Sequence, residues 1–172
     1  MSRLKCLFVL FLFATLLICA CSSDEEKKMS HFKKGQAYFE KGEFKAALLE
    51  YKNAVKIDPR YVAAYLEMAK TQLKLGDVGG AYRSYLRTSE LAPDNLEATI
   101  ALVKFYLLQR KLNEAANDID FILQKEPQNI EALLLLAGLR ELEKKSDEAG
   151  VIFRKIIALD SRNEPAYRSL DR

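Results

Sequence analysis

The sequence has few of the residues on which most catalytic sites depend. It contains one histidine, His31, so it cannot form a histidine cluster for a metal ion or a catalytic triad. It has no glycine-rich phosphate-binding loop. The acidic residues are spread among Lys and Arg, which is typical of a solvated face and not of an acid–base pair. We therefore expect no enzyme activity, no metal ion and no cofactor.

The sequence also has few cysteines and a small net charge. The three cysteines all lie in the first 21 residues, so the rest of the chain cannot form a disulfide and must be stabilised by packing. The 27 basic and 24 acidic residues leave a net charge of +3. This balance gives no electrostatic reason to expect nucleic-acid binding, which requires a clustered basic face.

The N-terminus has the pattern of a secretory signal. Arg3 and Lys5 precede an apolar run of about 15 residues, from Cys6 to Ala20. This run is shorter than the roughly 20 residues that span a membrane as a helix. It ends in Ile18-Cys19-Ala20-Cys21, which resembles the bacterial lipobox. The resemblance implies that residues 1–20 are a signal peptide and that Cys21 becomes the acylated first residue. An uncleaved anchor helix is the alternative.

Residues 21–27 follow as a short polar tether, although their acidic side chains would also suit the first turn of a helix. The lipobox resemblance implies a bacterial cell-envelope protein with a lipid anchor. Ser22 after the cysteine, with no aspartate there, implies sorting to the outer membrane, facing the periplasm.

The remaining chain repeats with a period of 34 residues. Such a period is typical of stacked helix pairs. Prolines recur at this spacing at Pro59, Pro93 and Pro127. Alanines recur with them at Ala47, Ala81, Ala115 and Ala149. Apolar spacing predicts helix pairs over about 25–41 and 44–57, 62–75 and 78–91, 96–109 and 113–125, and 130–144 and 147–159.

These repeats resemble the tetratricopeptide repeat family. The first unit carries that family's residues most fully, at Gly35, Tyr38, Ala47, Tyr51, Ala54 and Pro59. The resemblance implies an all-α domain over 28–172, built as a right-handed superhelix of tandem helix-turn-helix units. The units are about 28–61, 62–95, 96–129 and 130–163, with a short partial cap over 164–172.

Local signals predict how the helices begin. Asn95, Asn113 and Ser146 suit positions at or near helix N-caps. Gly79 and Gly80 lie near the start of one predicted helix. Each glycine costs about 1 kcal/mol relative to alanine in a helix interior. We therefore expect a frayed first turn at this point.

The family resemblance implies that the first helix of each pair lines a concave groove. Three positions per helix, spaced by four and three residues, share that face. They would form two apolar rows with a polar row, Gln–Lys–Lys–Gly, between them. The predicted groove residues are Phe32, Gln36, Phe39, Leu66, Lys70, Leu73, Ile100, Lys104, Leu107, Leu134, Gly138 and Glu141.

Such a groove would suit an amphipathic helix or an extended peptide with apolar anchors, and its lysines would suit an acidic group. Packing of these side chains against neighbouring helices is the competing interpretation. The preferred function is a lipid-anchored adaptor that recruits a protein partner in a cell-envelope assembly, secretion or export system. The alternatives are a structural protein that self-associates through its C-terminal end near Tyr167 and Leu170, and a non-catalytic subunit of an envelope enzyme complex.

Overall fold

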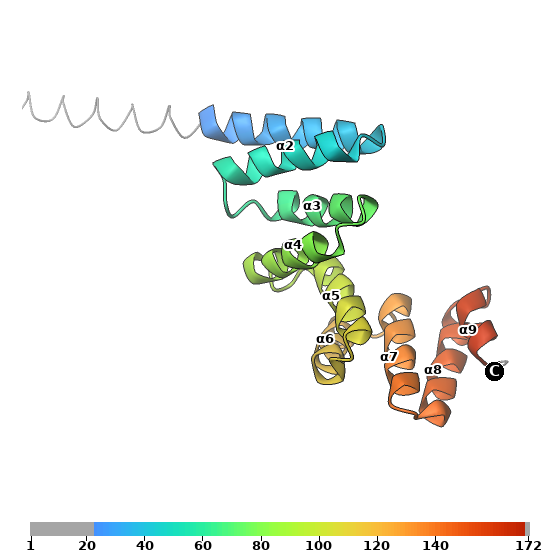
Figure 1. Ribbon diagram of the computed structural model, residues 1–172. Coiled ribbons are helices and arrows are strands. Elements are labelled where there is room, and N and C mark those ends of the chain that lie inside the picture. The colour runs from blue at the N-terminus through green and yellow to red at the C-terminus, as the bar shows by residue number, and fades with distance from the viewer. Residues whose placement is uncertain (1–22, 171–172) are drawn as a thin grey trace, which may run out of the picture. The chain divides into compact units, whose positions relative to one another are not determined.

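The computed structural model describes residues 23–170. The predicted signal peptide 1–20, the predicted lipid attachment at Cys21 and the last two residues of the predicted cap lie outside the described residues. The described part consists of α-helices joined by short turns and has no strand, which confirms the all-α prediction (Figure 1). It divides into two compact units, residues 23–87 and 88–170.

Helical pairing follows the predicted repeats closely. The first described helix covers residues 23–40, so the described part of the predicted tether, 23–27, is helical. The later helix ends differ from the expected ones by at most two residues. These helices are α2 (Phe44–Ile57), α3 (Val62–Lys74), α4 (Val78–Leu91), α5 (Leu96–Leu108), α6 (Leu112–Lys125), α7 (Ile130–Leu142), α8 (Ser146–Leu159) and α9 (Glu164–Leu170).

The N-terminal unit is built around a fully buried tyrosine. Tyr51 of α2 packs with Ala47 and with Met68 of α3, and aromatic side chains of the first helix close the cluster. Gly35 allows this packing, because a Cβ atom there would lie 2.5 Å from the Tyr51 ring. The glycine therefore permits the first helix to approach α2 closely.

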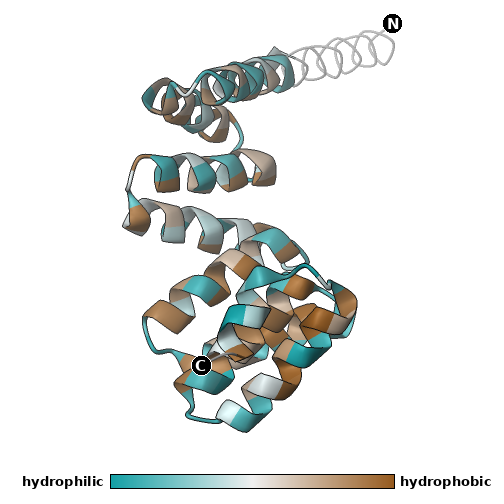
Figure 2. Ribbon diagram, turned by 90° about the vertical axis from the view of Figure 1, so that its right-hand side faces the viewer, coloured by the Kyte–Doolittle hydropathy of each residue, from teal (hydrophilic) through white to brown (hydrophobic). Residues whose placement is uncertain are grey.

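The C-terminal unit has two apolar clusters. One joins α5, α6 and α7 through Val103, Ile119 and Leu139. The other joins α7, α8 and α9 through Leu133, Phe153 and Ala166. Figure 2 shows the helices of this unit with large apolar segments. The short α9 covers part of α8, as the predicted partial cap requires.

The turn inside each pair has the same geometry four times. Gly42, Gly76, Arg110 and Lys144, spaced by 34 residues, all have φ between 59° and 77°. The residue after each donates its N–H to the carbonyl five residues earlier, as Glu43 does to Tyr38 and Lys111 to Tyr106. This is the Schellman helix ending, which glycine adopts with least strain.

The helix N-caps agree only partly with the predicted ones. Asn95 caps α5 as predicted, and Asn129 caps α7 in the same way, each accepting a backbone N–H three residues on at 2.9 Å. Asn113 is the second residue of α6 and so lies near its N-cap, as expected. The prediction of Ser146 as the N-cap of α8 was wrong, because Lys145 takes that position. The Schellman turn places the N-cap on the residue after the positive-φ residue, which is Lys111 or Lys145.

The predicted frayed turn at Gly79–Gly80 is an ordered one. The Asp77 carboxylate accepts the Gly80 N–H at 2.8 Å and so caps the start of α4. A Cβ atom at residue 80 would lie 2.1 Å from Asp77 Oδ2 and 2.3 Å from the Gln72 amide nitrogen. Both atoms lie at the ends of flexible side chains, so Gly80 is closely approached by the groups around the start of α4, whereas Gly79 faces open space apart from the Arg83 side chain.

Candidate functional site

The predicted groove positions fall on the first helix, α3, α5 and α7. In the N-terminal unit, the two phenylalanines belong partly to the core. The Phe32 ring centroid lies 5.1 Å from that of Tyr61 and 5.7 Å from that of Tyr51, and the Phe39 centroid lies 5.3 Å from that of Phe44. Both rings are half-buried, so the competing interpretation, that these residues pack against neighbours, holds for them.

The other N-terminal positions are more accessible. Gln36 is exposed, Leu66 is half-buried, and Leu73 near the end of α3 is 45% exposed. Leu73 is therefore an apolar side chain that the unit leaves open to solvent at a predicted groove position. Lys70 lies one turn away, where its ammonium group pairs with Glu67 at 2.9 Å.

The C-terminal groove positions also include both packed and accessible residues. Ile100 and Leu107 pack against the cluster of α5, α6 and α7, and Leu134 packs against the second cluster. Gly138 is open, since a Cβ atom built on it has no neighbour within 4 Å. A partner backbone could approach α7 closely at this point.

The lysines of the polar row are already paired. Lys104 of α5 donates to Glu131 of α7 at 2.6 Å, with both side chains about half exposed. Together with the Lys70–Glu67 pair, this contact neutralises the charges that the sequence offered to an acidic partner. The predicted preference for an acidic group thus loses its electrostatic support, while the apolar anchors remain.

Leu108 is an exposed apolar residue beside the predicted groove that the sequence prediction missed. Leu108, the last residue of α5, is 81% exposed and directly follows the predicted Leu107. α5 is apolar around much of its circumference, so periodicity did not single out one face. In the part of the chain that the structure describes, no neighbouring helix covers Leu108 at the C-terminal end of α5.

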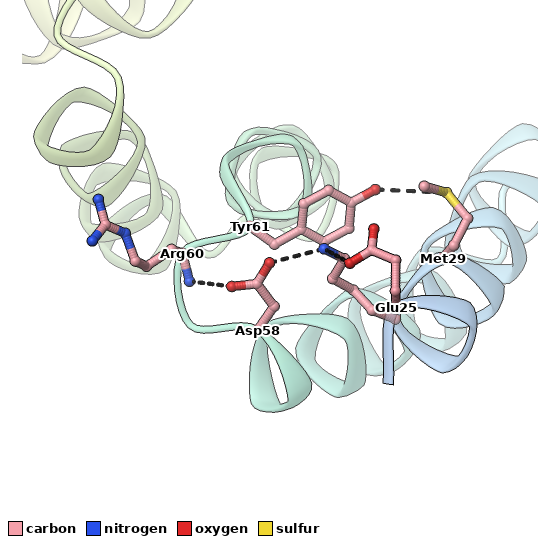
Figure 3. A network of polar contacts seen from close by, with 6 residues as sticks. Glu25, Met29, Asp58, Arg60 and Tyr61 are labelled. Carbon is pink, nitrogen blue, oxygen red and sulfur yellow. Dashed lines mark hydrogen bonds and ion pairs between the residues drawn. The ribbon is translucent and has the colours of Figure 1, made fainter. Parts of the chain in front are cut away.

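A polar network fixes the first helix to the turn before α3 (Figure 3). Lys28, though nearly buried, bonds Glu25 at 2.6 Å and Asp58 at 2.9 Å, and its ammonium group lies 4.6 Å from the Tyr61 ring centroid. The Glu25 and Asp58 bonds raise the pKa of Lys28. The Lys28 bond and the Arg60 N–H lower the pKa of Asp58. This network holds the helix that carries Phe32, Gln36 and Phe39.

The described residues contain no group of three or more His, Cys, Asp or Glu side chains that could hold a metal ion. His31 lies with its Nδ1 2.6 Å from Glu50 Oε2 and joins the first helix to α2. Within residues 23–170, no helix has both the length and the apolar character needed to cross a membrane.

A cleft lies at the end of the C-terminal unit, with a volume of about 530 Å³. It includes the predicted groove residue Glu141 together with side chains of α8 and α9. Val151 and Arg154 line one side and Leu170 the other. The exposed Val151 gives this cleft an apolar wall beside charged groups.

Sequence comparison finds the repeat signature in the N-terminal part of the chain. Residues 35–76 match the family model of the TPR (tetratricopeptide) repeat. Human sperm-associated antigen 1 is 30% identical over 90 residues, which are 52% of this chain and 10% of that protein. The mouse protein of the same name is 30% identical over 93 residues, which are 54% of this chain and also 10% of that protein. The chain thus spans about a tenth of the length of the curated relatives it matches.

Solved structures share the fold over most of the chain. A crystal structure of MamA protein matches with a TM-score of 0.76 and 22% identity, over 85% of this chain and 80% of MamA. A tetratricopeptide repeat protein from Parabacteroides merdae matches with a TM-score of 0.75 and 22% identity, over 83% of this chain and 56% of that one. Pseudomonas aeruginosa pilF matches with a TM-score of 0.69 and 18% identity, over 86% and 68% of the chains. The described chain therefore has the fold of a tetratricopeptide repeat protein.

Proposed function

We propose that this protein is a membrane-anchored scaffold whose first-of-pair helices bind a protein partner in a cell-envelope assembly, secretion or export system. The tetratricopeptide fold supports a role in protein–protein interaction. The signal and lipobox pattern ending at Cys21 supports the anchor. The anchor is proposed to hold the protein on the outer membrane, facing the periplasm.

The observation that carries the binding role is the exposure of one apolar side chain, Leu73, at a predicted groove position. Leu73 remains 45% exposed near the end of α3 although Leu66 on the same face is half-buried. Fully burying a leucine is favourable by about 1.5–3 kcal/mol, so burying the exposed part of Leu73 would contribute about 1 kcal/mol to partner binding. The neutralised lysines favour a partner that binds mainly through apolar contacts.

Site-specific photo-crosslinking in living cells tests this role. One variant carries the photoreactive residue in place of Leu73, and a control variant carries it in place of the exposed Lys155 on α8. We expect a discrete heavier band from the Leu73 probe alone. Equal adducts at both positions, or none at Leu73, would contradict the binding role of this face.

The lipid anchor has a separate test. In cells fed labelled palmitate, we expect the wild-type chain to incorporate label and to remain with the membrane fraction. Cys21→Ser should abolish incorporation, whereas Cys19→Ser should leave it unchanged. Label retained in Cys21→Ser would show that the lipid is attached elsewhere, whereas an unlabelled variant that stays with the membrane fraction would show that the apolar run is uncleaved.

A second candidate function, self-assembly through the C-terminal end, is favoured by the cleft on α8 and α9. Val151 lines this cleft and is exposed, and Tyr167 of α9, part of the predicted cap, is exposed as well. This function predicts oligomers that grow with concentration and are lost in a Val151→Glu, Tyr167→Glu variant. Light scattering of the full chain that shows a concentration-independent monomer would exclude it.

A further inference from the structure

The outward face of α2 carries a stripe of three lysines and one leucine. Lys45, Leu49, Lys52 and Lys56 are spaced by four, three and four residues, so they share one side of the helix. All four are exposed, and Leu49 is 58% exposed. The stripe extends for about 16 Å along the helix axis at a rise of about 1.5 Å per residue. It is therefore a basic surface with a single apolar side chain at its middle.

The charges on this stripe have no internal partner. Within residues 23–170, none of the three lysines forms a salt bridge or a side-chain hydrogen bond. None has an acidic residue three or four positions away, and Lys52 and Lys56 face each other at a spacing of four. Like charges at that spacing destabilise a helix. An external anion would relieve this repulsion.

The other second-of-pair helices provide an internal comparison. Residues shifted by 34 occupy the equivalent positions of α4, α6 and α8. None of these three sets has more than one basic residue. They are Gly79, Arg83, Leu86 and Glu90, then Asn113, Asn117, Asp120 and Gln124, then Asp147, Val151, Arg154 and Ala158. The fold does not require lysine at these positions, so the stripe is a property of α2.

Charge is also distributed unevenly along the chain. Residues 23–87 contain 13 basic and 9 acidic residues, whereas residues 88–170 contain 11 basic and 14 acidic ones. The basic part is the one that follows the N-terminal signal. Cys21 is two residues from Ser23, a reach of about 7 Å of extended chain. The Lys28–Asp58 bond then ties the start of the first helix to the end of α2.

We infer that the Lys45, Leu49, Lys52 and Lys56 face of α2 lies on the membrane surface and binds anionic phospholipid headgroups. The inference rests on the membrane anchor of the proposed function, and an uncleaved anchor helix would bring α2 equally close. Lysine ammonium groups are compact point charges that pair with phosphates. An exposed leucine among them can enter the interfacial region. Attraction to anionic lipid extends only about a Debye length, so the short reach from Cys21 matters.

Lysine footprinting of the full chain tests the inference. The protein is purified from host-cell membranes and reconstituted into vesicles of phosphatidylglycerol or of phosphatidylcholine, and an amine-reactive reagent is added outside. Mass spectrometry then gives the modification rate of each lysine. We expect Lys45, Lys52 and Lys56 to react at least about fivefold more slowly on phosphatidylglycerol, with recovery in high salt. Lys144 and Lys155 serve as unprotected references.

Variants sharpen the comparison. About 1 kcal/mol per basic residue at an anionic surface corresponds to roughly fivefold in affinity. A triple variant should therefore weaken the surface attachment on the order of 100-fold; it carries Lys45→Gln, Lys52→Gln and Lys56→Gln. An environment-sensitive probe at residue 49 reports the salt concentration at which this face leaves the vesicle, which should be lower in the triple variant. The control removes the same charge from other exposed positions, as Lys144→Gln, Lys155→Gln, Arg162→Gln. It should bind as the wild type does.

The outcomes separate this inference from the anchor on which it rests. A chain that stays with both kinds of vesicle but has equally reactive stripe lysines on both contradicts the headgroup contact alone. A chain that leaves both kinds of vesicle contradicts the anchor as well. Protection in whole cells without protection on phosphatidylglycerol would assign the stripe to an acidic protein instead, which also overturns the inference.

Discussion

Two helical glycines show how single residues act in this protein. A Cβ atom at residue 35 would meet the Tyr51 ring at 2.5 Å, whereas one at residue 138 would meet nothing within 4 Å. Tyr51 cannot move easily because it is fully buried. The first glycine is therefore needed for packing, and the second is a local weakness of α7.

Gly35→Ala and Gly138→Ala should accordingly change stability in opposite directions. Overpacking at residue 35 costs about 1–3 kcal/mol and helix propensity returns about 1 kcal/mol, so we expect a net loss of up to about 2 kcal/mol. At residue 138 only the propensity term acts, and we expect a gain of up to about 1 kcal/mol. Denaturant unfolding of the full chain measures both. Equal effects would show that Tyr51 does not constrain residue 35.

Asp58 couples the polar network to pH. Its bonds to Lys28 and to the Arg60 N–H lower its pKa in the folded state. A carboxyl with a lowered folded pKa stabilises the fold above its unfolded pKa, and this contribution disappears as pH falls through the folded pKa. The stabilisation is thus present at neutral pH and is lost below about pH 4, where unfolded aspartate titrates.

Asp58→Asn should remove that part of the pH dependence. We expect the wild type to be more stable than the variant at pH 7 and the difference to shrink as pH falls from about 5 to 2. Thermal unfolding at several pH values measures this difference. Asp94→Asn, at an exposed carboxylate paired with Lys125, is the control and should show a smaller change. A wild-type-to-variant difference that stays constant with pH would rule out the linkage.

At the scale of elements, a Schellman turn ends the first helix of each of the four pairs. The chain uses glycine at residues 42 and 76 but arginine and lysine at residues 110 and 144, all with positive φ. A side chain in this conformation costs about 1–2 kcal/mol relative to the usual helical one, whereas glycine enters it freely. The last two turns therefore hold strain that the first two avoid.

Replacing the strained residues should stabilise the C-terminal unit. We expect Arg110→Gly and Lys144→Gly each to raise the free energy of unfolding by about 0.5–1 kcal/mol, since the gain exceeds the added flexibility of the unfolded chain. Gly42→Ala should lower it by about 1 kcal/mol, although a Cβ atom there touches nothing. Chemical denaturation measures all three. A loss of stability in both glycine variants would show that the arginine and lysine side chains stabilise these turns.

At the scale of the whole molecule, each unit has its own apolar core. The cluster around Tyr51 contains residues 32–68, and the two clusters of the C-terminal unit contain residues 96–170. In tandem repeats, each element depends mainly on its neighbours in sequence. A core mutation should therefore act first on its own unit.

Phe153→Ala tests this local dependence. It removes a buried ring from the cluster of α7, α8 and α9, at a cost of about 3–5 kcal/mol. We expect amide hydrogen exchange to accelerate in residues 130–170 and to change least in residues 23–57. Tyr51→Ala should give the reverse pattern. Uniform acceleration along the chain in both variants would show a single cooperative unit.

Much of this structure could be predicted from the sequence because the repeat is local. Helix starts, helix ends and the 34-residue period depend on apolar spacing, on prolines and on turn residues that lie close together in the chain. These signals predicted the all-α class and the helix ends to within two residues. They were less successful at the caps, because the N-caps of α6 and α8 depend on the geometry of the preceding turn.

The contacts of the predicted groove residues could not be predicted from their spacing in the sequence. Spacing predicted which residues share a helix face, but not that Phe32 and Phe39 stack on other rings or that Lys104 pairs with Glu131 of another helix. Those facts depend on contacts between residues far apart in the sequence.

The sequence by itself thus determined the helices, their pairing and the N-terminal signal pattern, because each depends on neighbouring residues. Tertiary structure alone decided that Gly35 is required by packing and that the groove lysines are paired. It also decided that the lysines of α2 face outward without a partner. Exposure, pairing and steric contact are properties of the packed chain, so only the folded arrangement could reveal them.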